Sequence, residues 1–368
     1  MKKILILIAL LLLVGCSEKK EDVLYKESTT ESGFDTKIDL IASVDSQSEF
    51  DTYFKIVKEE FWRYHQMFDK YNDYDGINNI KTINDNAGIK PIVVDPITIE
   101  MLLLAKEYTE LSDGYFDITF GSVLEIWHDY REEGELLNAD GKPGRVPDMA
   151  VLEEAKQYTG WQFVEIDETN NTVYLTNPRT KLDVGAIAKG YATELVALTL
   201  EEQGLKHAIV SGGGNIRTIG TKLSGTPWSI GVEEPSDFPM GSSVDVFTFP
   251  SDMSVVTSGD YQRYYLVENE KRMSHLINPH TLMPEDIFKS VTIFTPNSSQ
   301  ADALSTAVYM MTYEEALEFK DRYNEQYPDQ AFEILWISDT ETEWTESKGY
   351  YIKMTPDLHS KSKNYPNP

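Results

Sequence analysis

Two oxygen-bearing side chains, Asp302 and Thr306, stand four residues apart in a segment whose pattern predicts a helix from residue 301 onward. Residues four apart project from the same face of a helix, so the carboxylate and the hydroxyl would point in one direction. Hard oxygen donors of this kind suit Mg²⁺. The alternative is that Asp302 only favours the positive end of the helix dipole, and the sequence alone leaves both explanations open.

A second segment with chemical potential is the glycine-rich stretch 181–194. An extended run closes at Asp183 and an amphipathic pattern follows, which predicts a strand that turns sharply into a helix. Gly185 and Gly190 permit close backbone approach, and Lys189 brings a cation to the first helical turn. Such a turn suits a phosphate, because its amides and the helix dipole favour an anion. Ordinary packing of the turn is the alternative.

The histidine best placed for proton transfer is His275, which lies at the edge of a predicted strand before a loop closed by Pro279. The charge of a histidine changes near neutral pH, so it can act as a general acid or base. We expect His280, inside that loop, to be solvated. His65 lies on the apolar stripe of a predicted helix, which indicates a core histidine whose ring is hydrogen-bonded.

Aromatic residues and a carboxylate accompany these groups. Residues 115–127 predict either a core strand that enters a turn or a cleft wall built from an aromatic ring and the carboxylate of Asp117. The polar loop 69–76 carries two tyrosines, which are either surface residues or rings that stack on a base. Three consecutive glycines at 212–214 predict either a flexible turn or close approach to a ligand.

The elements that position these groups follow from apolar periodicity. Consecutive strands with short loops imply antiparallel pairing, so we predict an α+β fold in which antiparallel sheets are flanked by helices. We expect helices at residues 46–71, 97–112 and 147–160, and a further helix that follows the glycine-rich turn after Asp183 and runs to residue 204. Strands are expected at 34–44, 163–175 (as a hairpin), 207–217, 228–232, 244–249, 253–257, 261–268 and 291–294.

The first sixteen residues have the pattern of a lipoprotein signal peptide. Two lysines precede an apolar run that is too short to span a bilayer, and the run ends at Cys16, the single cysteine of the chain. We expect lipidation of Cys16 and anchoring at the extracytoplasmic face of a bacterial cell membrane. The remaining chain divides into a flexible tether at 17–33, a catalytic domain at 34–358 and a loose tail at 359–368.

Charge narrows the classes of partner. Lys and Arg number 33 against 61 Asp and Glu, a net charge of −28. Such a surface repels polyanions, which argues against nucleic acid and anionic lipid as ligands. An anionic ligand would therefore have to be met by local cations, backbone amides or a metal ion.

Six segments, in this order and spacing, resemble the ApbE family, the FAD:protein FMN transferases. They are residues 115–119 (YFDIT), 182–191 (LDVGAIAKGY), 211–215 (SGGGN), 257–261 (TSGDY), 275–279 (HLINP) and 301–306 (ADALST). The resemblance covers the chain from about residue 34 to the last strands. It implies an ApbE-type fold with FAD bound in a cleft.

The resemblance also implies an activity. Members of the family cleave the pyrophosphate of FAD, release AMP and join FMN through a phosphoester to a Ser or Thr hydroxyl of a target protein. The implied partners are FAD, Mg²⁺ and an exported or membrane-bound acceptor flavoprotein. Carried over by position, Asp302, Thr306 and a backbone oxygen of Ala186 would bind Mg²⁺, and His275 would be catalytic. The implied FAD-lining residues are Phe34, Tyr71, Tyr115, Phe116, Asp117, Asp183, Lys189 and Leu276.

The chain departs from the family pattern at three places. Phe34-Asp35-Thr36 stands where many members have Met-Gly-Thr, Asn278 replaces a common aspartate, and Leu282 replaces a common glycine. We therefore expect different local contacts near Phe34 and in the loop after His275. Two other functions compete with transfer: an FAD pyrophosphatase that uses water as acceptor, and a non-catalytic flavin-binding lipoprotein.

Overall fold

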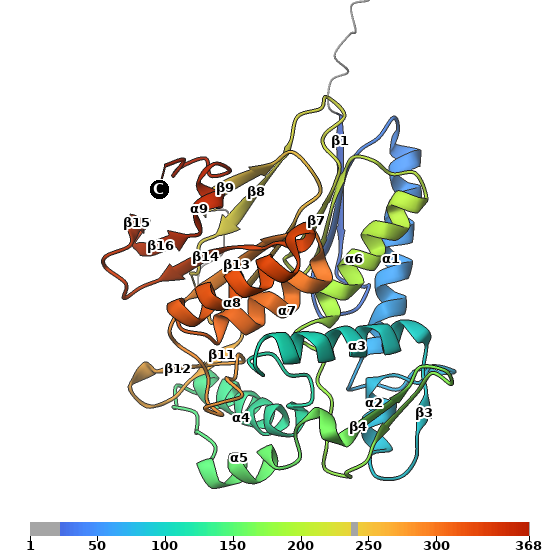
Figure 1. Ribbon diagram of the computed structural model, residues 1–368, viewed down its shortest axis with the longest axis vertical. Helices are drawn as coiled ribbons and strands as arrows, with labels where there is room; N and C mark the ends of the chain where they lie inside the picture. Colours follow the sequence, from blue (N-terminus) through green and yellow to red (C-terminus); the bar gives the residue numbers. More distant parts are fainter. Residues whose placement is uncertain (1–22, 237–241, 368) are drawn as a thin grey trace, which may run out of the picture.

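A computed structural model describes residues 23–236 and 242–367. Within these residues the largest sheet has nine strands, and every neighbouring pair is antiparallel (Figure 1). In spatial order the strands are β1 (Leu24–Thr29), β2 (Ile38–Ser43), β6 (Ala208–Gly212), β7 (Asn215–Ile219), β10 (Ser254–Gly259), β13 (Ser290–Thr295), β14 (Glu333–Ser338), β16 (Tyr350–Met354) and β15 (Thr345–Ser347).

The central strands of this sheet are apolar on both faces. In β14, Ile334 and Trp336 pack in the core under the helices, while Leu335 and Ile337 pack in a second core on the opposite face. Alternate side chains of a strand point to opposite faces, so a strand covered on both sides needs a continuous apolar run.

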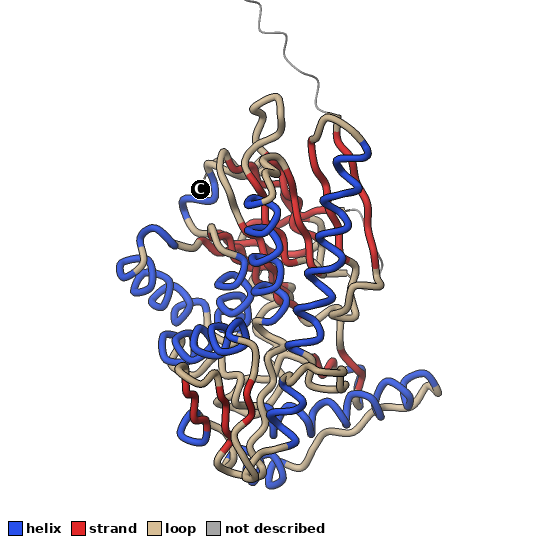
Figure 2. Tube along the Cα trace, turned by 90° about the vertical axis from the view of Figure 1, so that its right-hand side faces the viewer, coloured by secondary structure: helices blue, strands red, loops and turns tan. Residues whose placement is uncertain are grey.

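Helices cover one face of the sheet and a hairpin covers the other. The helical layer contains α1 (Gln47–Phe68), α6 (Ala188–Glu202) and α7 (Ser298–Tyr309), and α6 packs against both other helices. Figure 2 shows the long helices standing alongside the strands. The hairpin β8 (Trp228–Glu233) and β9 (Ser243–Phe249) supplies Ile230, Val232 and Phe247 to the second core.

A smaller part of the molecule lies below the sheet in Figure 1 and completes the cleft described below. Its helices are α2 (Ile80–Asp85), α3 (Pro96–Leu111), α4 (Gly121–Ala139) and α5 (Met149–Lys156). Its strands are β3 (Ile92–Val93), β5 (Thr172–Leu175) and β4 (Val164–Asp167) in one sheet, and β11 (Tyr264–Leu266) with β12 (Arg272–Ser274) in another. The elements α8 (Tyr313–Gln326) and α9 (Pro356–His359) lie nearer the C-terminus.

Several predicted elements are confirmed. Ser46 caps α1 by accepting a hydrogen bond from the Glu49 amide, and Asp148 caps α5 in the same way through Ala150. The glycines after β6 form a tight turn, with Gly213 at φ 62° and Gly214 at φ 90°. Positive φ at both central residues matches the twist of a two-residue hairpin, so this segment is a turn between β6 and β7.

Three predicted elements are wrong. No strand lies between β5, which ends at Leu175, and α6, and Lys181 in that segment makes only an isolated bridge to Phe120. The amide and carbonyl of Leu182 pair instead with the side chain of Asn84, at 2.8 and 2.9 Å. Residues 121–139 form helix α4 rather than the continuation of a strand, and β2 begins at Ile38 rather than at residue 34.

The predicted tether at 17–33 is also wrong in part, because Leu24–Thr29 is strand β1. Most of its side chains are solvent-exposed, as expected of an edge strand. The segment is therefore mostly polar, and its composition resembles that of a linker. Its order comes from backbone pairing with β2 and from the Tyr25 ring, which stacks on Phe50 at 5.7 Å.

The predicted loose tail at 359–368 is packed against β9 as far as Tyr365. Buried Asp245 accepts hydrogen bonds from the Ser362 hydroxyl and, at 3.1 Å, from the Asn364 amide. Cys16 and its signal peptide lie outside the described residues. None of the helices that the structure describes is long and apolar enough to cross a membrane.

Candidate active site

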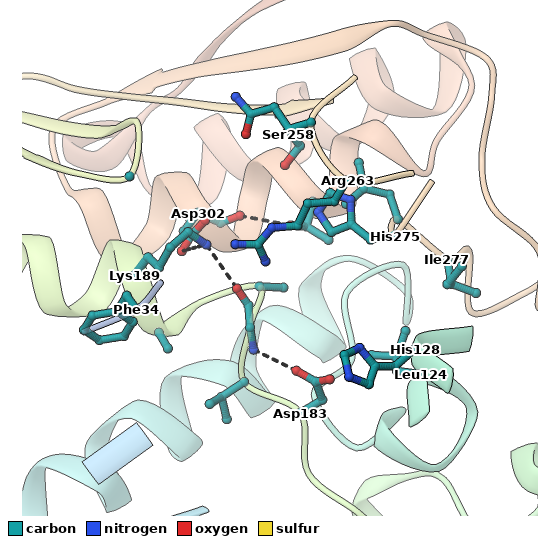
Figure 3. Close-up of a pocket in the computed structure, with 18 of the residues that line it drawn as sticks. Phe34, Leu124, His128, Asp183, Lys189, Ser258, Arg263, His275, Ile277 and Asp302 are labelled. Carbon is teal, nitrogen blue, oxygen red and sulfur yellow. Dashed lines mark hydrogen bonds and ion pairs between the residues drawn. The ribbon is translucent and has the colours of Figure 1, made fainter. Parts of the chain in front are cut away.

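A cleft of about 410 Å³ lies between the helical layer of the large sheet and the smaller part of the molecule. Loops after α1, β10 and β12 line it, together with α4, α7 and the segment that leads into α6 (Figure 3). All twelve site residues expected within the described chain line this one cleft: Phe34, Tyr71, Tyr115, Phe116, Asp117, Asp183, Ala186, Lys189, His275, Leu276, Asp302 and Thr306.

Asp302 projects from α7 into the cleft, although only 5% of the residue is exposed. Its Oδ2 accepts a hydrogen bond from the Gly190 amide at 2.8 Å. The nearest cation is Lys189, whose Nζ lies 4.0 Å from the same oxygen and donates to the Gly185 carbonyl at 3.3 Å. Asp302 is therefore held by an amide while its charge is only loosely paired.

The carbonyl of Ala186 lies in the turn that leads into α6. Helix α6 begins at Ala188 with Ile187 as its N-cap, so Ala186 stands before the first carbonyl that the helix uses. The Gly190 amide is one of the helix-start amides that have no partner inside a helix, and it donates to Asp302. The Ala186 carbonyl receives no backbone hydrogen bond within the described ranges, so its oxygen is available to a cation.

These oxygens fit a hard cation. Asp302 supplies one carboxylate, Thr306 a hydroxyl one turn along the same helix, and Ala186 the unpaired carbonyl. The described residues hold no cluster of three or more His, Cys, Asp or Glu side chains that could bind a metal. A site here would therefore combine one carboxylate with neutral oxygens, which is a set that Mg²⁺ accepts when water or phosphate oxygens complete it.

Gly190 serves helix packing. A Cβ added there would come within 2.4 Å of both the Cβ of Asp302 and the carbonyl oxygen of Ser298. The amides of the turn before α6 are largely used internally, since Gly185 donates to Asp183 and Ala188 to Val184. Lys189 rather than this turn is therefore the group that can meet a phosphate.

His275 lies on the same side of the cleft, after β12. Its Nδ1 is buried and has no hydrogen-bond partner among the described residues. Burial, followed by the nearby charges of Arg263, Arg131 and Lys189, lowers the pKa of His275 to about 3. The imidazole is therefore neutral at physiological pH and can accept a proton without first losing one.

The opposite side of the cleft holds a closed ion pair. Lys70 Nζ lies 2.5 Å from Asp183 Oδ2. Burial alone would raise the pKa of Asp183, but the attraction and hydrogen bond of Lys70 lower it overall. Lys70 also lies 4.8 Å from the centre of the Tyr71 ring, which tilts against His128 at 5.6 Å. This side therefore combines a neutralised carboxylate with an aromatic ring.

Tyr115 and Asp117 form a further part of the wall. The Tyr115 ring stacks on His280 with ring centres 4.3 Å apart and planes 8° apart. The prediction that His280 is solvated is confirmed, since the residue is exposed, but one ring face is covered. Burial raises the pKa of Asp117, although its carboxylate accepts hydrogen bonds from the amide and hydroxyl of Thr119 at 2.8 and 2.7 Å.

Comparison with known sequences identifies the family of this chain. A family model described as the ApbE family matches residues 34–328. The chain belongs to the ApbE family. An FAD:protein FMN transferase of Vibrio cholerae is 28% identical over 312 residues, which cover 84% of this chain and 88% of that protein. One of Klebsiella pneumoniae is 30% identical over 252 residues, covering 67% and 74%.

Solved structures support the ApbE fold. The ApbE protein of Thermotoga maritima superimposes with a TM-score of 0.72 at 29% identity, covering 91% of this chain and 98% of that one. The flavin transferase ApbE of Vibrio cholerae gives a TM-score of 0.70 at 22% identity, covering 92% and 99%. The predicted α+β class, with antiparallel sheets and flanking helices, is therefore confirmed.

Two departures from the ApbE family pattern keep the backbone that glycine would favour. Asp35 has φ 47° and Leu282 has φ 63°, both in the left-handed region. The Phe34 amide donates to His65 Nδ1 at 3.1 Å, and His65 Nε2 lies 3.1 Å from the Tyr74 hydroxyl. The His65 ring is thus hydrogen-bonded as predicted, but the residue is only partly buried and lines the cleft, so its predicted place in the core is wrong. The loss of glycine at 282 does not by itself require a different loop path.

Sequence reasoning missed several charged or titratable residues that line the cleft, among them Lys70, His128, Arg131 and Arg263. Lys70 directly precedes Tyr71, a residue expected to line the FAD site. Arg263 follows the family-like segment 257–261 by two residues. Both residues could therefore have been found from their neighbours in the sequence. His128 and Arg131 lie on α4. The residues before them were interpreted as a strand, so this helix was not predicted.

Proposed function

We propose that this protein transfers FMN from FAD to a Ser or Thr hydroxyl of a target protein, with Mg²⁺ as cofactor and AMP as the second product. Membership of the ApbE family supports flavin transfer in general. The observation that supports the finer proposal is the convergence of one loosely paired carboxylate, an unpaired carbonyl and a neutral histidine on one cleft.

The transfer step is a displacement at phosphorus. The acceptor hydroxyl oxygen forms a bond to the phosphorus of the FMN half, and the bond from that phosphorus to the bridging oxygen breaks, so AMP leaves with the electron pair. The hydroxyl proton passes to neutral His275, which is our candidate general base. Such reactions depend on neutralising phosphate oxygens more than on covalent help from the protein.

The residues of the cleft divide this work. Lys189, Arg131 and Arg263 supply positive charge beside His275 on a protein that is otherwise strongly acidic. Asp302, Thr306 and the Ala186 carbonyl would hold Mg²⁺, which supplies further charge neutralisation at the pyrophosphate when it is bound. The aromatic rings of Tyr71 and Tyr115 offer flat apolar surfaces for the ring systems of FAD.

An in vitro assay tests the proposal. The protein is incubated with FAD and Mg²⁺, with and without an acceptor protein, and AMP, free FMN and acceptor mass are measured. We expect AMP together with an FMN-sized mass gain on the acceptor. Equal AMP and free FMN in both tubes would identify an FAD pyrophosphatase, and unchanged FAD in both would identify a flavin-binding protein without activity.

We further propose that the enzyme works outside the cytoplasm, held by lipid on Cys16, and that its acceptor is an exported or membrane-bound redox protein. The lipoprotein-like signal sequence supports this location. Cys16→Ser removes the thiol that would take the lipid, so we expect an unprocessed or released protein. Detergent-phase partitioning of the variant measures this, and partitioning equal to that of the wild type would refute the anchor.

A further inference from the structure

Two hydrogen bonds join α6 to α7 beside the oxygens proposed to bind Mg²⁺. The Gly190 amide donates to Asp302 Oδ2 at 2.8 Å, and the Ser298 amide donates to Glu194 Oε2 at 2.6 Å. Each helix contributes two residues that are four apart, so both bonds lie along a single contact between the helices. Together they set the register of α6 against α7.

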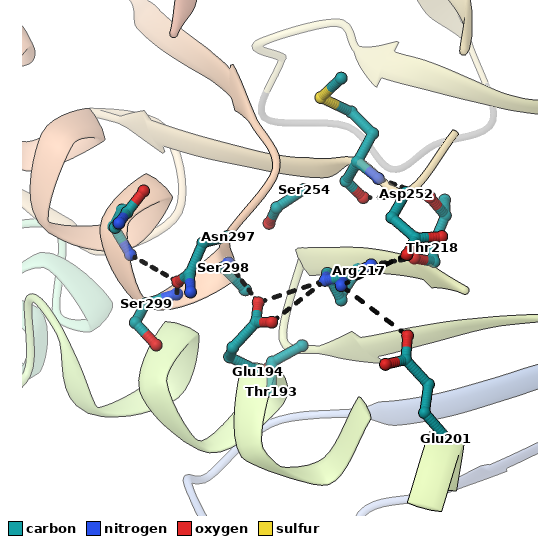
Figure 4. Close-up of polar contacts among 12 residues, drawn as sticks. Thr193, Glu194, Glu201, Arg217, Thr218, Asp252, Ser254, Asn297, Ser298 and Ser299 are labelled. Carbon is teal, nitrogen blue, oxygen red and sulfur yellow. Dashed lines mark hydrogen bonds and ion pairs between the residues drawn. The ribbon is translucent and has the colours of Figure 1, made fainter. Parts of the chain in front are cut away.

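The Glu194 carboxylate is buried at the N-terminus of α7 (Figure 4). Only 4% of the residue is exposed, and Ser298 is the first residue of the helix. The Asn297 side chain caps α7 by accepting hydrogen bonds from the next two amides, those of Ser299 and Gln300. Glu194 accepts the hydrogen bond of the Ser298 amide, which this cap does not reach. A negative charge is also favoured at this end of a helix.

Arg217 holds Glu194 in place from the sheet below. Its Nε lies 3.3 and 3.2 Å from the two carboxylate oxygens of Glu194, and both side chains are more than nine-tenths buried. Arg217 also faces Glu201 and Asp252, each at 3.8 Å. Three elements, α6, α7 and β7, therefore meet at the carboxylate of Glu194.

We infer that Glu194 is a positioning residue for the magnesium site, an inference that rests on the proposed function. Ala186 stands in the turn two residues before α6, while Asp302 and Thr306 stand on α7. The distances among their oxygens therefore depend on the register of the two helices. Glu194 fixes that register, although it lies one helical turn beyond Gly190 and is not among the residues that line the cleft.

The test is Glu194→Gln, with Glu201→Gln as a matched control. Both residues lie on α6 and face Arg217, but only Glu194 contacts α7. Binding of Mg²⁺ is measured by calorimetry without FAD, beside binding of FAD without Mg²⁺ and the melting temperature. We expect Glu194→Gln to weaken Mg²⁺ binding about 10–100-fold, as for other groups that orient ligands. We expect FAD binding to change little and Glu201→Gln to leave Mg²⁺ binding at the wild-type level.

A second variant protects the test if Glu194→Gln does not fold. Ser298→Pro removes the amide that Glu194 accepts, and proline is well tolerated at the first position of a helix. Asn297 has φ −117° and ψ 128°, which suits a residue before proline. We expect the same selective loss of Mg²⁺ affinity.

The outcomes separate this inference from the proposed function. Wild-type Mg²⁺ affinity in Glu194→Gln, which removes the charge that pairs with Arg217, or in Ser298→Pro, which removes the hydrogen bond to α7, would overturn the role of Glu194 while leaving the transferase proposal in place. Equal losses in Glu194→Gln and Glu201→Gln would also overturn it, because a general loss of packing would then explain both. A wild-type protein that binds no Mg²⁺ yet transfers FMN would refute the metal requirement of the proposed function and this inference with it.

Discussion

Asp302 and Asp183 lie on opposite sides of one cleft, and the fold gives them partners of opposite kinds (Figure 3). Asp183 forms an ion pair with Lys70, in which Lys70 Nζ lies 2.5 Å from Asp183 Oδ2. Asp302 receives one backbone amide and has its nearest lysine at 4.0 Å. A carboxylate that is already neutralised has little to offer a second cation, whereas one held by an amide keeps its charge available.

The difference extends to the neighbours of each carboxylate. Lys189, His275 and the unpaired Ala186 carbonyl accompany Asp302, so this side can meet phosphate and move a proton. Aromatic Tyr71 accompanies Asp183, so that side can hold a ring system. We expect substitutions on the Asp302 side to lower kcat and those on the Asp183 side to act on KM for FAD.

The largest effect is expected for His275→Ala. Loss of a general base typically lowers the rate by about 10²–10⁴-fold, and FAD should still bind because the rest of the cleft is intact. Single-turnover transfer and FAD binding measure the two effects. Near-normal turnover across neutral pH would place the base elsewhere.

Asp302→Ala should lower transfer by more than about 100-fold at ordinary Mg²⁺, because it removes the one carboxylate assigned to the metal. Raising Mg²⁺ should restore part of the rate. Thr306→Val should be milder, since water can replace a hydroxyl ligand. Rates are measured against Mg²⁺ concentration, and superimposable curves for Asp302→Ala and the wild type would show that this helix face does not bind the metal.

Asp183→Asn tests the side of the cleft opposite Asp302. The substitution leaves Lys70 partly buried without its counter-charge, so the wall beside Tyr71 should rearrange. We expect KM for FAD to rise about 10-fold, because loss of a hydrogen-bonded charge partner costs about 1.4 kcal/mol or more, with kcat nearly unchanged. A fall in kcat like that of Asp302→Ala would erase the distinction between the two sides.

The smallest effect concerns pH. With His275 as the proposed general base, activity requires the neutral imidazole, so we expect activity to be lost as pH falls through the pKa of His275, about 3 in the protein without FAD. The pyrophosphate of FAD would offset the charges of Arg263, Arg131 and Lys189 that help to lower this pKa. The acid limb of kcat should therefore lie at higher pH than that of kcat/KM. Coinciding limbs would contradict this coupling.

Much of the scaffold follows from local pattern. Helix α1 has apolar residues at three- and four-residue intervals and a serine cap, and α3 and α5 begin at aspartate caps, so each can be predicted from its own residues. The edge strand β1 and the packed tail around Ser362 could not, because their order comes from distant partners, β2 and Asp245.

The candidate site shows the same division. Helix periodicity alone places Asp302 and Thr306 on one face, and the resemblance to the ApbE family supplies the residues expected around FAD. The ion pair of Lys70 with Asp183 joins residues 113 positions apart, and no local pattern connects them. Nor does any local pattern show that the Gly190 amide donates to Asp302, 112 positions away.

Side-chain chemistry and helix spacing are local properties, so the order of residues is enough to show which side chains could do chemistry. Which of these side chains are free to react depends on the fold. Asp183 is neutralised and Asp302 is left available because Lys70 and Gly190 approach them from elsewhere in the chain. Burial and three cations set the protonation state of His275 in the same way. Electrostatic energies depend on distances in space, which the order of residues does not record.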